Sequence, residues 1–144
     1  MKGNKNMRIL AIDYGDSRVG LAVSDIMGWM AQGIKTVPNH GEKKLLSEIE
    51  PVLKEYNPEK IVLGLPKNMD GTMGFRVDAT KKFAESLKTI YSGEIVFWAE
   101  RLTTVSAAHI LNETNTRGKK RKNVIDTVSA CMILDDYLGR MKNI

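Results

Sequence analysis

The sequence predicts an α/β fold: a mixed five-stranded sheet, with its first three strands antiparallel, its later strands parallel and helices on its faces. Two patterns predict it. Near the start, an almost continuous apolar run, turn residues and a second apolar segment indicate a buried hairpin. Further along, short runs rich in β-branched residues alternate with segments of helical spacing, as in parallel strands joined by helices. The chain's 144 residues suit one domain with a single core.

The opening strands follow one another closely. Arg8 to Tyr14 is apolar at nearly every position, which predicts a central strand buried on both faces. Turn residues Gly15 to Ser17 separate it from a second strand, Arg18 to Ser24. A third, short strand is expected from Ile34 to Val37, where Pro38 ends it. The short links require these strands to pair antiparallel.

The rest of the chain alternates helices with strands. A helix expected over Glu42 to Tyr56 contains Pro51, which predicts a kink or a late start. Helical spacing also extends from Val77 to Ile90, and a further helix capped by Thr103 is expected to run through Leu111. The remaining elements are strands at 60–65 and 95–99, a turn-rich loop at 66–74, a basic loop at 115–122, and a last helix from about Asn123 to about Met141.

Composition favours a globular protein of the cytoplasm. It is 42% hydrophobic and 27% charged, which argues against disorder. No apolar run approaches the roughly 20 residues of a membrane helix, so no membrane association is expected. The polar residues 1–6 are expected to be a disordered lead-in to a single domain at 7–144. One cysteine, Cys131, excludes an internal disulfide and a Cys-based zinc site.

The charge favours a polyanionic partner such as nucleic acid. The formal net charge is +5, and nearly all of this excess can be assigned to one stretch, Lys119, Lys120, Arg121 and Lys122. Many small enzymes are mildly basic, so the clustering carries more weight than the total. We expect this stretch to contact the phosphate backbone.

Three acidic residues are candidates for catalysis, and each also has a plainer interpretation. Asp13 ends the first buried strand and is otherwise a solvated turn residue; Glu100 follows the strand at 95–99 and is otherwise a surface ion pair. Asp126 lies in the first turn expected for the last helix, where the helix dipole alone favours a negative charge. Together they can meet at one edge of the sheet and bind divalent cations. Oxygen ligands suit Mg²⁺ or Mn²⁺, and such ions can activate water against a phosphodiester.

Four motifs in order resemble the YqgF/RuvX family, from Met7 to Gly139. That family is described as Holliday junction resolvases and as nucleases that process the precursor of small-subunit ribosomal RNA. The motifs are Ala11-Ile12-Asp13-Tyr14-Gly15 with Arg18 to Asp25, Val62 to Gly71, Glu100 to Thr104, and the basic stretch followed by Val124-Ile125-Asp126 and Ser129-Ala130.

The resemblance implies an RNase H-like fold, with Asp13, Glu100 and Asp126 as the catalytic and metal-binding acids. It also implies that Lys67, Asn68 and Arg101 surround the substrate groove. Each also has an interpretation without a function: Lys67 as a solvated lysine, Asn68 as a turn-forming amide and Arg101 as part of a surface ion pair.

Departures from the family keep other interpretations open. Ala99 stands where the family usually has the first acid of a pair, so metal binding is expected to be weaker if that acid is a ligand. Asp16 replaces a common threonine and Ser129 a common alanine. A nucleic-acid-binding module without useful catalysis stays open because of Ala99. An actin-like ATPase or sugar kinase is a third class, but it would need two such domains.

The expected substrate is precursor 16S ribosomal RNA, trimmed at its 5′ side, and this preference comes from the resemblance alone. Branched DNA is the alternative, and ribosomal particles are a further expected partner. A symmetric junction resolvase would need a homodimer, whereas an RNA-trimming enzyme could act as a monomer.

Overall fold

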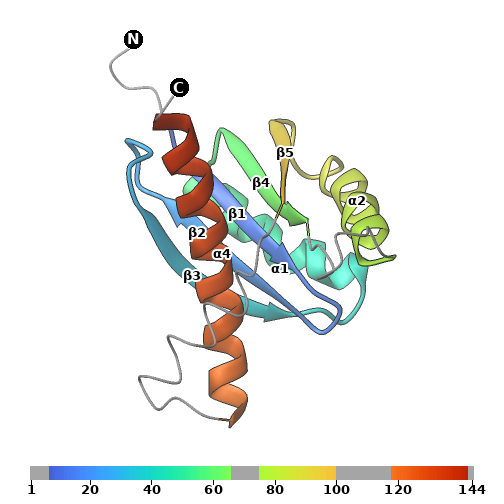
Figure 1. Ribbon diagram of the computed structural model, residues 1–144. Helices are drawn as coiled ribbons and strands as arrows, with labels where there is room; N and C mark the ends of the chain where they lie inside the picture. Colours follow the sequence, from blue (N-terminus) through green and yellow to red (C-terminus); the bar gives the residue numbers. More distant parts are fainter. Residues whose placement is uncertain (1–6, 66–74, 100–117, 143–144) are drawn as a thin grey trace.

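The computed structural model describes residues 7–65, 75–99 and 118–142, and in the last of these ranges it describes side chains from Thr127 to Met141. Figure 1 shows the arrangement of the elements. In chain order they are β1 (Ile9–Tyr14), β2 (Arg18–Ser24), β3 (Ala31–Pro38), α1 (Glu42–Tyr56), β4 (Lys60–Leu65), α2 (Phe75–Leu87), β5 (Glu94–Ala99) and α4 (Gly118–Lys142).

The strands form one five-stranded sheet in the order β3-β2-β1-β4-β5. β1 pairs antiparallel with β2, and β2 pairs antiparallel with β3. On the other side β1 pairs parallel with β4, and β4 pairs parallel with β5. The predicted mixed sheet is therefore confirmed, with β1 at its centre.

Helices cover both faces of this sheet, α1 and α2 on one and α4 on the other (Figure 1). Alternate residues of β1 serve the two layers, because successive side chains of a strand point to opposite faces. Leu10 and Ile12 belong to the core under α1 and α2, whereas Ile9 and Ala11 belong to the core under α4. Asp13 continues the second set, so its position is on the α4 face.

The core under α4 is built on that helix's stripe of apolar residues. Its buried residues are Ala130, Ile133, Leu134, Tyr137 and Leu138. They recur every three or four positions, so they form one side of the helix. The first α4 residue in this described core is Ala130. The described core therefore includes no residue from the first part of α4, which begins at Gly118.

The expected start of the third strand is wrong. β3 begins at Ala31 rather than Ile34, because the residues before Ile34 also pair with β2. The pairing contains a bulge: Leu21 pairs with Lys35 and Ala22 pairs with Gly33, so Ile34 has no partner. The small and polar residues Gln32 and Gly33 lack strand character and owe their conformation to this pairing. α1 spans Glu42–Tyr56, as expected, and contains Pro51, so of the two alternatives expected at that proline the late start is excluded.

The basic residues 119–122 are part of α4, not of a loop. Lysine and arginine have high helix propensity, and no proline or glycine interrupts the chain between Gly118 and Asp126. Asn123 therefore lies inside the helix rather than capping it. Asp126 lies about two turns from the start of the helix, so the dipole interpretation of its charge no longer holds.

The loop expected at 66–74 and the helix expected after Thr103 lie outside the described residues. No helix in the described ranges combines the length and apolar character that crossing a membrane requires.

Candidate active site

Asp13 lies next to the end of β1, at the edge of the sheet where the parallel strands also end. β4 ends there at Leu65 and β5 ends there at Ala99, because both run parallel to β1. Glu100 directly follows Ala99 in the sequence, and Lys67 follows Leu65 by two positions. The topology therefore brings Asp13 to the carboxyl edge of the sheet, together with the strand ends that precede Lys67 and Glu100 in the sequence, and sites in open α/β sheets gather at this edge.

Glycines flank Asp13 on both neighbouring strands. Asp13 is paired with Gly20 of β2, and Gly64 of β4 follows Leu63, the partner of Ile12. Neither neighbour has side-chain atoms to place over the carboxylate. Asp13 is half-buried, whereas the four residues before it in β1 are buried. A carboxylate in such a position is costly unless it is hydrogen-bonded or binds a cation.

Hydrogen bonds from Asn39 hold the turn after Asp13, which has no room for a side chain at Gly15. A Cβ atom on Gly15 would lie 2.5 Å from the carbonyl oxygen of Arg18, so this turn accepts no side chain at that position. Asn39, just after β3, donates from Nδ2 to the Gly15 carbonyl at 2.8 Å and from its backbone N–H to the Ser17 carbonyl at 2.8 Å. Asn39 could not be singled out from local patterns, because its contact with Gly15 depends on how β3 pairs.

A pair of threonines joins β3 to α4 on the Asp13 face. The hydroxyl oxygens of Thr36 and Thr127 are 2.7 Å apart and hydrogen-bonded. Thr36 is paired with Gly20, which is itself the partner of Asp13, so the contact lies in the same row of the sheet. Sequence reasoning missed both threonines, and only the register of the strands could have singled them out.

The other predicted site residues are described in part or not at all. Asp126 and the basic stretch 119–122 lie on the α4 backbone, and their side chains are not described. Glu100, Lys67, Asn68 and Arg101 lie outside the described residues. Among the side chains that are described, no group of three or more His, Cys, Asp or Glu residues could hold a metal ion. The convergence of Asp13, Glu100 and Asp126 stays a prediction.

Local hydrogen bonds or burial explain the shifted pKa values of Asp25, Lys60 and Cys131. The backbone N–H of Trp29 donates to Asp25 Oδ1 at 2.7 Å and lowers the pKa of that carboxyl. The hydrogen bond from Lys60 Nζ to the Tyr137 hydroxyl, at 3.0 Å, raises the pKa of Lys60. Burial raises the pKa of the Cys131 thiol, which makes it a poor nucleophile.

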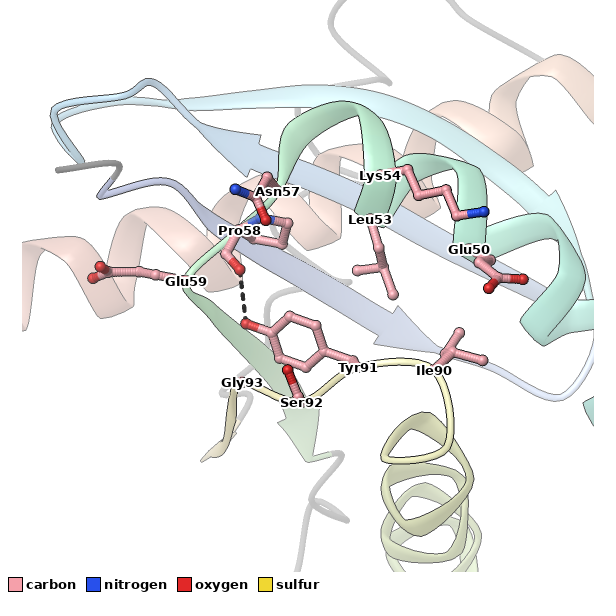
Figure 2. Close-up of a pocket in the computed structure, with 10 residues that line it drawn as sticks. All are labelled: Glu50, Leu53, Lys54, Asn57, Pro58, Glu59, Ile90, Tyr91, Ser92 and Gly93. Carbon is pink, nitrogen blue, oxygen red and sulfur yellow. Dashed lines mark hydrogen bonds between the residues drawn. The ribbon is translucent and has the colours of Figure 1, made fainter. Parts of the chain in front are cut away.

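A cavity of about 330 Å³ lies between α1, the residues that precede β4 and the segment before β5, and Figure 2 shows the side chains that line it. The Tyr91 hydroxyl lies in it and donates to the Pro58 carbonyl at 2.9 Å. Pro58 lies two residues before the first residue of β4, and Gly93 directly precedes β5. This cavity is therefore at the amino edge of the sheet. A second cavity of about 330 Å³, lined in part by Met7 and Met141, lies at the same edge of the sheet. Neither contains a predicted site residue.

Relatives by sequence match nearly the whole chain. A "Putative pre-16S rRNA nuclease" of Bacillus subtilis (strain 168) is 48% identical over 137 residues, covering 94% of this chain and 99% of that protein. A protein with the same description from Ruminiclostridium cellulolyticum is 44% identical over 136 residues, covering 94% of this chain and 96% of its own.

Solved structures show the same fold at low sequence identity. RuvC of T. thermophilus, in complex with Holliday junction substrate, has a TM-score of 0.57 at 12% identity, covering 94% of this chain and 96% of its own. The Fowlpox virus resolvase with Holliday junction DNA has a TM-score of 0.55 at 13% identity, covering 94% and 99%. The predicted RNase H-like fold is confirmed by these resolvases.

The family model described as "RuvX: Holliday junction resolvase" matches residues 7–140. This match spans β1 to α4 and includes Asp13, Glu100 and Asp126. The chain therefore belongs to the RuvX family, as its sequence motifs predicted.

Proposed function

We propose that the single domain at 7–144 is a cytoplasmic, metal-dependent endonuclease that hydrolyses phosphodiester bonds in precursor 16S ribosomal RNA. The observation that carries this proposal is the position of Asp13, a half-buried carboxylate between two glycines at the carboxyl edge of the sheet. Membership of a family of nucleases supports hydrolysis of phosphodiesters.

The residues at this edge fit a hard divalent cation. Asp13 offers carboxylate oxygens, and Glu100 and Asp126 are the acids that we expect beside it. Such a set, with no His or Cys, matches the oxygen ligands that Mg²⁺ and Mn²⁺ prefer. The bound ion would supply charge stabilisation to the phosphate and a more acidic water. Ala99 in place of an acid limits the site to these three carboxylates.

The first turns of α4 would hold the substrate. Residues three, four and seven apart lie on the same side of a helix. Lys119 and Lys122 precede Asp126 by seven and four positions, so they share its side of α4, whereas Lys120 and Arg121 occupy other sides. We expect the first pair to contact the phosphates nearest the acids. Lys67, Asn68 and Arg101 follow the strand ends at the same edge and would orient the strand that is cut.

Ribosomal RNA is preferred over branched DNA because of how the relatives are described. The proteins of 44–48% identity are described as acting on pre-16S rRNA. The junction resolvases share only 12–13% identity and support the fold alone. Ribosomal particles would then present the substrate, and a monomer would suffice for one cut. A homodimer fits the alternative of symmetric junction cleavage.

The test is cleavage of a precursor 16S rRNA fragment and of a four-way DNA junction, each with Mg²⁺ and with EDTA. Asp13→Asn keeps the shape of the side chain and removes its charge. We expect it to lower the cleavage rate more than about 100-fold while RNA binding is retained. Equal cleavage by Asp13→Asn, or cleavage in EDTA, would overturn the proposal. Cutting of the junction alone would favour the DNA alternative, and binding without cleavage would favour the binding module.

A further inference from the structure

The hydrogen bond between Thr36 and Thr127 joins segments that are 91 positions apart in sequence. Their Oγ1 atoms are 2.7 Å apart at a partly buried position. Thr36 is on β3, at the edge of the sheet, and Thr127 is the first residue of α4 whose side chain the structure describes. The bond therefore holds the amino-terminal half of α4 to the sheet.

The strand register places this bond in the row of Asp13. Asp13 is paired with Gly20, and Gly20 is paired with Thr36. Neighbouring strands lie about 4.8 Å apart, so the Cα atoms of Asp13 and Thr36 are separated by roughly 10 Å. Because Gly20 has no side chain, nothing from β2 rises between Asp13 and Thr36 on the α4 face.

The bulge in β3 gives α4 a second fixed contact. It separates Gly33 from Thr36 by an extra residue, so that both face α4 while Ile34 packs on the opposite core. A Cβ atom on Gly33 would lie 2.5 Å from Thr127 Cγ2. Thr127 is thus held by its hydroxyl to Thr36 and by its methyl group against Gly33, which fixes both the rotation and the height of the helix.

Asp126 directly precedes Thr127, and this sequence position makes the contact important for the site. Ala130, four residues after Asp126, is fully buried against the sheet, so the two share one side of α4. The described apolar core of α4 begins only at Ala130. Among the described contacts between α4 and the sheet, the hydrogen bond between Thr36 and Thr127 is the one nearest to Asp126 in the sequence.

We infer that Thr36 and Thr127 are positioning residues: their hydrogen bond sets where Asp126 stands relative to Asp13 and so tunes metal binding at the site. The inference rests on the proposed nuclease function. The rest of α4 is held by large buried side chains such as Ile133 and Leu134. Loss of one hydroxyl leaves those contacts in place and shifts the segment around Asp126.

The experiment compares Thr36→Val, Thr127→Val and the double variant in two measurements: the affinity for Mn²⁺ by isothermal titration calorimetry without RNA, and Mg²⁺-dependent cleavage of the precursor 16S rRNA fragment. Each single variant should need about 10- to 100-fold more Mg²⁺ for half-maximal cleavage, with KM for RNA within about twofold. The double variant should be no worse than either single one, because both remove the same bond. Thr36→Ser keeps the hydroxyl and leaves the Thr127 methyl group in place, so it should retain the Mg²⁺ requirement of the wild type.

Thr89→Val is the matched control. Its hydroxyl also makes a 2.7 Å hydrogen bond, to the Ser86 carbonyl, but at the end of α2, away from α4. It should leave the Mg²⁺ requirement unchanged. All assays are run well below the melting temperature, with folding checked by circular dichroism. If Thr127→Val does not fold, Thr36→Val on the edge strand and Gly33→Ala, which displaces the same turn of α4, decide the question.

An unchanged Mg²⁺ requirement in the valine variants, or additive effects in the double variant, would overturn the inference. So would a loss of activity that follows the fraction of folded protein alone. Failure of the proposed function looks different, because wild-type protein would then not cleave and Asp13→Asn would have no effect. Cleavage by wild type with normal Mg²⁺ dependence in both valine variants rejects the positioning role and leaves the nuclease intact.

Discussion

The indole Nε1 of Trp98 donates a 2.6 Å hydrogen bond to Asp136 Oδ2, which links β5 to α4 on the face that contains Asp13. The Trp98 ring also packs edge-on against Tyr137, with ring centroids 5.2 Å apart. Trp98 precedes Glu100 by two positions. The contact therefore holds the strand that leads to one expected acid against the helix that contains another.

Removal of this hydrogen bond should destabilise the protein modestly. Trp98→Phe keeps an aromatic ring against Tyr137, and Asp136→Ala removes the acceptor. Each should lower the free energy of unfolding by about 1 kcal/mol in urea titrations. The double variant should lose less than the sum of the two. A sum that agrees within about 0.5 kcal/mol would mean that the two groups do not interact in solution.

Gly15→Ala should destabilise the turn that follows Asp13. The added Cβ would lie 2.5 Å from the Arg18 carbonyl oxygen, so the backbone must move, at a cost of about 1–3 kcal/mol in the free energy of unfolding. Gly139→Ala in α4 is the matched control. A Cβ there meets nothing within 4 Å, and alanine favours the helix by about 0.5–1 kcal/mol. The change in the free energy of unfolding, measured in urea, should therefore be destabilising for Gly15→Ala and stabilising for Gly139→Ala. A Gly15→Ala protein as stable as the wild type would show that the turn has another conformation.

Stability should fall steeply in strong alkali because of Tyr91. Burial, with the negative charges of Glu59 and Glu94, raises its pKa from 10.0 to about 12. The folded state therefore holds this proton more tightly than the unfolded state. The stabilisation is complete below pH 10 and is lost as the pH rises through 12. Lys60, whose pKa is also raised, adds to the loss above pH 10.5.

Tyr91→Phe separates the two contributions. Without the hydroxyl, the hydrogen bond to the Pro58 carbonyl is lost, so the variant should be about 1 kcal/mol less stable at pH 8. Its stability should then decline less than that of the wild type between pH 10 and 12, and the raised pKa of Lys60 contributes to the decline that remains. Parallel stability curves in thermal melts over this range would contradict the assignment to Tyr91.

The four basic residues of α4 should contribute unequally to nucleic-acid binding. Because they are consecutive on a helix, at 3.6 residues per turn, their positions are spread around most of its circumference. Lys119→Gln with Lys122→Gln should weaken binding and lower the slope of log Kd against log salt by about 1.4–1.8. Lys120→Gln with Arg121→Gln should have a smaller effect.

A charge-matched control excludes a general effect of net charge. Lys43, Lys44, Lys81 and Lys82 are exposed on α1 and α2, on the other face of the sheet. Replacing two of them by glutamine removes the same charge and should leave the salt slope unchanged. Equal slopes for all these pairs would show that α4 is not the contact with the phosphates.

Most of the architecture could be predicted from local patterns in the sequence. The boundaries of β2 and β4 and of α1 were predicted correctly, because their apolar periodicity and flanking turn residues agree. The placement of Asp13 at the carboxyl edge followed from the order of the elements. The start of β3 could not be predicted, because Ala31 to Gly33 adopt the strand conformation only through their pairing with β2.

The contacts around the candidate site were beyond sequence reasoning for a similar reason. Whether Thr36 faces α4 or the opposite layer depends on the single residue that the bulge inserts, since each added residue reverses the facing of a strand. Asn39 is equally unremarkable until the end of β3 is known to lie beside Gly15. Charge misled the prediction for residues 119–122, where a solvated loop was expected and helix propensity decided the outcome.

The bulge in β3 also bears on how copies of this chain avoid one another. A strand at the border of a sheet exposes unpaired N–H and C=O groups that can recruit a strand from another molecule. β3 is such a border, but its irregularity at Ile34, the exposed charge of Lys35 and the missing N–H of Pro38 interrupt the regular row of groups. This border is consequently a poor template for aggregation.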